Sequence, residues 1–461
     1  MSAILYELFV VHPFLLLLLL TESILLWYTY RKFEGDVFSP SVLTLALFFL
    51  STLCFIYNIQ RWIVVFTYKA YCLFTLSFLI MVCIESYYFS KKKKMTEFAS
   101  FQYRPIIIKH ENLLFTILVL FSFIYIYRVY RSGMSLGATS LLMTIGANKE
   151  EGDYDAYSRL FFNLVRFTSY TYSVVVFYNV LVCGESLRKH WKIVIVLILS
   201  IINAFFSGQR SSAIGLIIAF LVAAKICLYY KDKLERNRLM KKFRKKLVNL
   251  SIIILALFFL SASAVKNREN ETQFADYMTY YFGSTTALMG RIVEKPYICH
   301  TPFRGYFGEK TFMGFWDFMY NSGFVKKKHC DREWINMGDV KIPERAGNEY
   351  TFFCAPYIDF GFGGTLIFIA FFYWMFSYLY YKKIYGHKMS NEIIAKIAIY
   401  IFLYVMVCMS FYQDTIRTYT RPINLLYLVY IYCISKYIFK FGKTKEAKTS
   451  TLNLEQASKK H

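Results

Sequence analysis

Long runs of apolar residues, separated by short polar turns, make up most of this chain. Most of these runs approach or exceed the roughly 20 residues that an α-helix needs to cross about 30 Å of hydrocarbon. The pattern predicts an all-α polytopic membrane protein with about eleven transmembrane helices, within a range of ten to twelve. The predicted spans are residues 4–28, 41–57, 63–89, 113–130, 160–183, 193–206, 212–230, 247–265, 361–381, 393–411 and 423–439.

These spans divide the chain into four parts. Residues 1–265 hold the first eight membrane helices, and residues 266–352 form one large extracytoplasmic loop with short helices. Residues 353–440 hold the last three membrane helices, and residues 441–461 form a basic cytoplasmic tail. The first 20 residues contain no Lys or Arg, whereas a cleavable signal peptide begins with a basic region. We therefore expect the first segment to remain as a span.

The charged residues argue for a membrane protein and indicate its orientation. Only 18% of the 461 residues are charged, where soluble domains carry about a quarter. The net charge of +24 comes from basic loops that alternate along the chain, as the positive-inside rule predicts, so nucleic acid is not an expected partner. The basic loops, expected in the cytoplasm, are residues 91–94, 187–192, 231–246, 382–388 and 440–461. The intervening outer loops are residues 58–62, 131–159, 207–211, 266–352 and 412–421, which places the N-terminus outside and the C-terminus inside.

The sequence lacks several common nucleotide-binding and metal-binding motifs. It has no phosphate loop of the GxxxxGK type and no GxGxxG, so a nucleotide-driven cytoplasmic mechanism has no support. It also has no CxxC, no HExxH and no cluster of His and Cys with the spacing of a metal site. We therefore predict no cofactor and no bound metal.

The large outer loop carries most of the unusual residues. Its acidic and basic residues nearly balance and are interleaved with aromatic residues, a mixture typical of a folded segment. Long loops within a compact architecture are usually functional. Residues 312–324 form a short aromatic run that cannot span a membrane, and we expect an amphipathic helix along the interface.

Arginines recur in three of the outer loops. They are Arg210 in a tight turn, Arg291 and Arg304 in the large loop, and Arg417 and Arg421 in the last turn. The planar guanidinium group binds phosphate through two parallel hydrogen bonds, so a lipid diphosphate in the outer leaflet would suit several of them. Carboxylates and a histidine for acid or base chemistry are available at Asp276, Glu294, His300, Asp359 and Asp414.

Each of these residues has a structural alternative. Arg210 can cap the carbonyl groups of the preceding helix or extend to lipid headgroups. Asp414 and Arg417, three residues apart, have the spacing of an ion pair within a helix. His300 can be an ordinary surface residue, and Asp359 can hold the start of its span against a neighbour.

Arg166 differs from the other arginines because it lies inside a predicted span. Ionisable residues at such positions are rare and usually functional, because burying an unpaired charge in a bilayer is unfavourable. We expect Arg166 to contact a ligand within the membrane.

Two stretches resemble the oligosaccharide repeat-unit polymerases, the Wzy-type polymerases of O-antigen and capsular polysaccharide. Residues 207–220, SGQRSSAIGLIIAF, are similar to the family's small-polar-Arg-Ser turn that opens an apolar helix. Residues 347–376, GNEYTFFCAPYIDFGFGGTLIFIAFFYWMF, resemble the segment that closes its large periplasmic loop. We interpret Gly361, Gly363 and Gly364 there as positions of close helix packing.

The resemblance implies a reaction at the periplasmic face of a bacterial inner membrane, in a GT-C-like glycosyltransferase architecture. A growing glycan on undecaprenyl diphosphate would be transferred to the next lipid-linked repeat unit, with a chain-length regulator as a further partner besides membrane lipids. Substrate contacts are then expected from Arg210, Arg291, Arg304, Arg417, Arg421, Arg166 and Asp414, and the catalytic base from Glu294, His300 or Asp276. The alternatives are an O-antigen ligase and a lipid-linked saccharide flippase or transporter.

Overall fold

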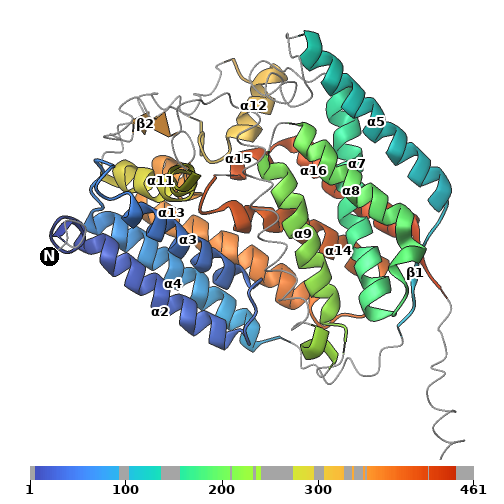
Figure 1. The fold of residues 1–461 in the computed structure, drawn as a ribbon, viewed down its shortest axis with the longest axis horizontal. Coiled ribbons are helices and arrows are strands. Elements are labelled where there is room, and N and C mark those ends of the chain that lie inside the picture. Colours follow the sequence, from blue (N-terminus) through green and yellow to red (C-terminus); the bar gives the residue numbers. More distant parts are fainter. Residues whose placement is uncertain are drawn as a thin grey trace, which may run out of the picture.

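A computed structural model describes residues 6–92, 103–135, 156–207, 210–231, 235–239, 274–294, 306–326, 335–336, 346–347, 350–413 and 415–442. These residues are mostly helical (Figure 1). In this part of the chain, nine helices are long and apolar enough to cross a membrane. They are Pro13–Lys32 (α2), Pro40–Tyr57 (α3), Tyr68–Ser90 (α4), Glu111–Ser135 (α5), Tyr157–Val182 (α7 with η3), Leu187–Phe206 (η4 with α8), Ser211–Leu228 (in α9), Cys354–Ile384 (α13 with η6) and Asn391–Met409 (α14).

These nine helices coincide one by one with nine of the eleven predicted spans, so the prediction of an all-α polytopic membrane protein is confirmed. The last predicted span is also a helix, α16 (Pro422–Tyr437), but its 16 residues are fewer than those of the nine. The predicted span at 247–265 lies outside the described residues. The total of eleven spans therefore stays a prediction.

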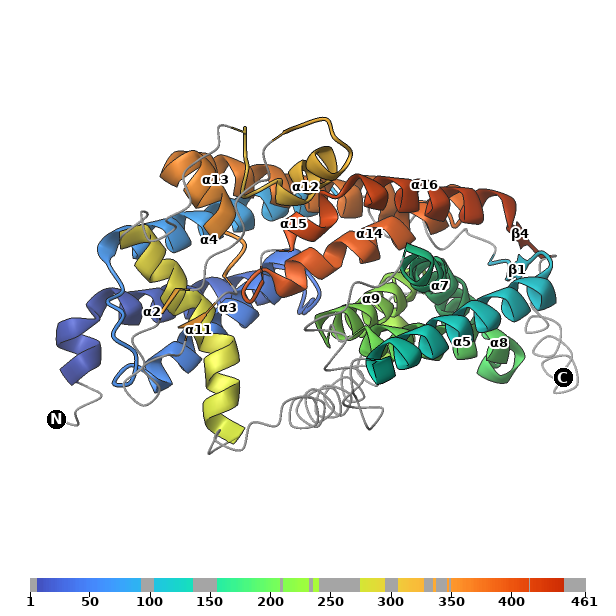
Figure 2. The ribbon, with the colours of Figure 1, turned by 90° about the horizontal axis from the view of Figure 1, so that it is seen from above.

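The helices form two groups that lie side by side (Figures 1 and 2). The first group packs α2, α3, α4 and α13 together, and the second packs α5, α7, α8, α9, α14 and α16 together. Helix α14 contacts α3 of the first group as well as η6 (Tyr378–Ile384), the continuation of α13. It is apolar on all sides and buried along almost its whole length, as expected for a helix surrounded by others.

The ends of the helices define two faces of the molecule. The basic face carries the turn 33–39, Lys91 and Lys92, the turn 385–390 and residues 439–442, and the opposite face is called here the outer face. At the basic face β1 (Ile106–Ile108) pairs antiparallel with β4 (Phe439–Phe441). At the outer face β2 (Ile335–Asn336) pairs with β3 (Ala346–Gly347).

The predicted large loop contains a long helix in addition to the short ones expected. Helix α11 (Phe274–Glu294) runs across α3, and a Cβ atom on Gly283 would lie 2.7 Å from the backbone of Cys54. Its last three turns are mostly buried, so this segment belongs to the first helix group. Sequence analysis missed this because charged and aromatic residues are interleaved in α11, whereas the predicted spans are uniformly apolar.

The short aromatic run forms the expected helix, α12 (Met313–Asn321). Phe315, Phe318 and Tyr320 on this helix are exposed. The helix lies at the outer face against α15 (Ile416–Tyr419) and α16 (Figure 1). Its position along a membrane interface stays a prediction.

Candidate functional site

The turn between α14 and α16, residues 410–421, joins the two helix groups at the outer face and is called here the outer turn. Its first residues are fixed by the first group. Phe352 donates its backbone N–H to the Ser410 carbonyl oxygen at 2.9 Å, and the Thr285 hydroxyl donates to the Phe411 carbonyl oxygen at 2.7 Å. The rings of Phe282 and Phe411 stack with centroids 5.3 Å apart. Helix α11 and the segment before α13 therefore hold this end of the turn.

The second end of the outer turn packs on the other group. The Tyr419 hydroxyl donates to the Phe402 carbonyl oxygen at 3.2 Å, and the two rings lie 4.7 Å apart. Tyr427, in the second turn of α16, stacks on Phe167 of α7 at 4.3 Å. The outer turn thus brings α15 and the start of α16 against the outer half of α7.

Arg166 lies on α7 at this junction. Its Nε is buried and has no hydrogen-bond partner among the described residues. Its guanidinium carbon lies 5.8 Å from the Phe162 ring and 5.9 Å from the Phe167 ring. The hydroxyl of Tyr170, one helical turn further along, is also buried without a partner of hydrogen-bond geometry.

The described residues around Arg166 supply dipoles rather than an opposite charge. Tyr170, Tyr419 and Tyr427 lie close enough to interact electrostatically with the guanidinium. Within the described part of the chain, Arg166 forms no ion pair with a carboxylate. A buried cation is strongly unfavourable without a counter-ion, so this arrangement is suited to binding an anionic group.

Two long helices begin at the outer face and strengthen this preference for anions. Helix α9 begins at Arg210, and α16 begins directly after Arg421, which is exposed. The N-terminus of a helix carries partial positive charge and free N–H groups, which favour anions and disfavour cations. Arginines at these two positions add positive charge to that of the helix N-termini. The side chains of Arg210 and of Arg417, on α15, lie outside the described residues.

The other candidate residues on α11 lie elsewhere. Helices α11 and α7 are on opposite sides of the molecule in both views (Figures 1 and 2). Arg291 is half-buried and Glu294 is exposed, at the end of α11 where Gly290 meets Phe66. Arg291 and Glu294 therefore lie apart from Arg166. Asp276 is in the first turn of α11, with its side chain outside the described residues, and the same holds for all of His300, Arg304 and Asp414.

Asp359 has a structural role, as its alternative interpretation proposed. Its carboxylate accepts hydrogen bonds from the Lys310 N–H at 3.1 Å, the Thr311 N–H at 2.6 Å and the Thr311 hydroxyl at 2.6 Å. These bonds fix the turn that leads into α12. With three donors already bound, Asp359 is poorly placed to act as a base.

The glycines after Asp359 do not serve close helix packing, and that interpretation is wrong. A Cβ atom on Gly361 or Gly363 would have no neighbour within 4 Å, and one on Gly364 would meet only the Phe360 side chain of its own helix. Gly361 instead adopts φ 67° and ψ −166° and kinks α13. The glycine is needed there for its backbone conformation.

Sequence analysis missed the tyrosines around Arg166. Tyr170 follows Arg166 by four residues, and this spacing on a predicted helix was a usable signal. Tyr419 and Tyr427 come from segments about 250 residues away, and only packing brings them to α7. Among the described residues no group of three or more His, Cys, Asp or Glu side chains could hold a metal ion.

Comparisons of the chain with protein-family models, with curated proteins and with solved structures find no match.

Proposed function

We propose that this protein is a membrane-embedded glycosyltransferase that polymerises oligosaccharide repeat units carried on undecaprenyl diphosphate at the periplasmic face of a bacterial inner membrane. The observation that carries the proposal is Arg166, a buried cation next to the outer turn that forms no ion pair with any of the described residues. A lipid-linked diphosphate has the matching properties, because its polyprenyl chain lies in the bilayer while its anionic head lies near the surface. Arg417 and Arg421 on the outer turn supply further positive charge at the same junction.

In the proposed reaction the diphosphate is the leaving group. The bond between the anomeric carbon of the donor glycan and the diphosphate oxygen breaks, and the oxygen keeps the electron pair. A hydroxyl of the acceptor repeat unit forms the new glycosidic bond and gives its proton to a base. Arg166, Arg210, Arg417 and Arg421 would stabilise the negative charge that develops on the diphosphate. The donor carries its own leaving group, so the reaction needs no cytosolic nucleotide.

The acceptor and the base are assigned to the other part of the outer face. Glu294 is exposed on α11, and Asp276 and His300 are the alternative bases. Arg291, close to Glu294 in sequence, and Arg304 would contact the glycan, and Asp414 would do so from the outer turn. A long saccharide can contact both α11 and the outer turn, because α11 packs on the first residues of that turn.

The experiment is to replace Arg166 and examine the glycans made in cells that lack their own copy of the gene. For Arg166→Gln we expect polymerisation to fall about 100-fold, the usual effect of removing a group that stabilises developing charge. Arg166→Lys should recover only part of the activity, because a point charge replaces the planar fork. Arg128→Gln is the matched control. Arg128 is on α5, near the outer end of the same helix group, and lies over the ring of Tyr157 on α7.

The product pattern separates the alternatives. A polymerase variant without activity leaves single repeat units attached to the lipid A core, whereas loss of a ligase leaves none attached. Loss of a flippase leaves repeat units on the cytoplasmic side. Normal chain lengths from Arg166→Gln at normal protein level would refute the proposed role of Arg166. Loss of activity together with loss of membrane insertion would be a folding effect, which Arg166→Lys should not share.

A further inference from the structure

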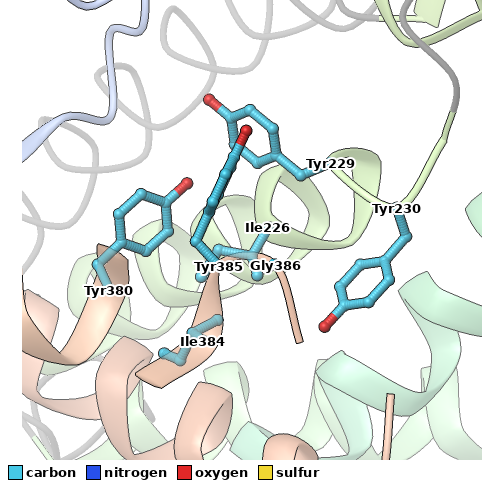
Figure 3. Close-up of a pocket in the computed structure, with 7 residues that line it drawn as sticks. All are labelled: Ile226, Tyr229, Tyr230, Tyr380, Ile384, Tyr385 and Gly386. Atoms are coloured by element: carbon cyan, nitrogen blue, oxygen red, sulfur yellow. The ribbon is translucent and has the colours of Figure 1, made fainter. Parts of the chain in front are cut away.

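Two clusters of aromatic side chains differ in how completely they are covered. At the basic face, Tyr229, Tyr230 and Tyr380 line a hollow with room for about one water molecule, so neighbouring side chains fill the space around them (Figure 3). Residues 306–326, called here the α12 segment, lie at the outer face and leave several rings uncovered. Phe307 is 76% exposed and Phe324 is 71% exposed. Packing among the described residues therefore does not account for the outer cluster.

One side of α12 is apolar and exposed. Phe315 and Phe318 are three residues apart, which places them on the same side of the helix, and both are exposed. Asp317, the acidic residue of α12, is half-buried on another side, and Met313 and Gly314 are buried. A phenylalanine ring has no polar group to offer to water, so its exposure forgoes the free energy that burial would give. This side of α12 is therefore suited to an apolar environment.

The α12 segment is attached to both helix groups, so its exposed rings are held in place. Asp359 of α13 accepts two backbone N–H groups from the segment, at 3.1 and 2.6 Å. The Phe307 ring lies 5.2 Å from the ring of Phe360, and the Trp316 indole N–H donates to the Phe307 carbonyl oxygen at 3.2 Å. Helix α12 also contacts α15 and α16. The segment therefore connects the outer ends of the two groups.

The exposed rings lie between two apolar helix surfaces that face outward. Figure 2 shows α12 at one edge of the molecule, between α13 and α16. Along α13, which is long and apolar enough to cross a membrane, Ile367, Phe371 and Trp374 form an exposed stripe. The first turns of α16 expose Ile423 and Leu426. Exposed apolar stripes on membrane-crossing helices contact the hydrocarbon of the bilayer, so the rings of α12 continue a lipid-facing surface.

We propose that the exposed rings of the α12 segment insert into the bilayer leaflet at the outer face. These rings are Phe307, Phe315, Phe318 and Phe324. An amphipathic helix of this kind lies in the plane of the interface, with its apolar side roughly 5–10 Å into the boundary between headgroups and acyl chains. Acyl chains match these rings better than a saccharide does, because saccharide hydroxyl groups need hydrogen-bond partners and phenylalanine has none to offer. Since α12 contacts α15, insertion would hold the outer turn at the depth of the headgroups.

The test is photo-crosslinking of the full-length protein in vesicles of phosphatidylcholine with radiolabelled acyl chains. The photoreactive analogue p-benzoylphenylalanine replaces Phe318, and illumination attaches it to the molecule beside it. We expect this position to capture lipid as strongly as the same analogue does at Ile367, on the exposed stripe of α13. The analogue at Phe315 gives a second reading of the same side of α12, which decides the matter if the protein altered at Phe318 fails to insert into the vesicles.

Tyr320 is the matched control position. It is an exposed aromatic residue on the same helix, and two residues correspond to about 200° of rotation, which places it on the side opposite Phe318. With the analogue at Tyr320, lipid capture should fall to the level seen without illumination.

Three results would refute the proposal. One is equal lipid capture from positions 318 and 320, and another is attachment of position 318 to a different part of the chain in place of lipid. The third is capture of an oligosaccharide added to the vesicles in place of lipid, which would make the segment a glycan-binding surface. The vesicles contain no lipid-linked saccharide, so lipid capture does not depend on the proposed glycosyltransferase activity.

Discussion

Gly361 carries one of the least common backbone conformations in this protein. Its φ of 67° with ψ of −166° lies in a region that is essentially restricted to glycine, and Thr365 donates its hydroxyl to the Gly361 carbonyl oxygen at 2.7 Å. The kink at this residue directly follows Asp359, which holds the turn before α12. The glycine conformation and the side-chain anchor at Asp359 together fix the position where the outer loop meets α13.

Replacing Gly361 should destabilise the protein without creating a steric clash. For Gly361→Ala we expect a loss of about 1–3 kcal/mol, because the alanine must adopt a conformation that only glycine tolerates. Gly363→Ala is the control, since Gly363 has a helical conformation with open space around it, and alanine there should be neutral or slightly stabilising. Thermal unfolding of both purified variants measures the difference. Equal stability of the two variants would contradict the strain expected for alanine at position 361.

At the residue scale, the sequence indicates which residues are unusual but not what they contact. Arg166 is recognisable from its position in an apolar run, and the structure leaves its Nε without a partner. The role of Asp359 depends on backbone N–H groups of Lys310 and Thr311, about 50 residues away. A local pattern contains no information about such contacts, so both a catalytic and a structural interpretation of Asp359 fitted the sequence.

At the element scale, uniform hydrophobicity made nine spans predictable and mixed composition concealed others. Helix α11 mixes polar and aromatic residues along its length, and only packing against α3 shows that its last turns are buried. The pairing of β1 with β4 joins segments more than 300 residues apart, and each strand has three residues. No periodicity can be recognised in a segment so short.

Asn179 attaches this small sheet to the second helix group. Its side-chain amide donates to the Ile106 carbonyl oxygen at 2.7 Å and accepts the Ile106 N–H at 2.8 Å, as an additional strand would. Asn179→Ala should therefore cost about 2–4 kcal/mol, because two buried backbone groups lose their partners. Faster hydrogen exchange at residues 106–108 and 439–441 would be the specific sign. Thr116→Ala, at an exposed position on α5, should change stability by less than about 0.5 kcal/mol, and a similar loss in both variants would contradict this assignment.

At the scale of the whole molecule, a few polar contacts join the two helix groups near the basic face. Lys225 of α9, 2% exposed, pairs with Asp36 in the turn between α2 and α3. Asp36 also accepts the Phe38 N–H at 2.8 Å, and the Tyr404 hydroxyl of α14 donates to the Phe38 carbonyl oxygen at 2.6 Å. The turn 33–39 is thus bonded to two helices of the second group.

The buried pair should act as a specific connection between the groups, and a double-mutant cycle tests this. Lys225→Met removes the counter-ion and leaves Asp36 buried with uncompensated charge, which should cost about 3–5 kcal/mol. Asp36→Asn keeps an oxygen for the Phe38 N–H but leaves Lys225 unpaired, so a loss of similar size is expected. In the double variant no charge remains to be compensated, and most of the stability should return, since buried pairs and apolar replacements are often nearly equivalent.

Unfolding of the four proteins in the same detergent gives the coupling between the two positions. If the losses of the single variants simply add in the double variant, the two side chains act independently and the pair does not hold the groups together. If the double variant instead recovers its stability, each charge is needed only to compensate the other. The two groups would then be joined by apolar packing around α14, and the ion pair would fix their register.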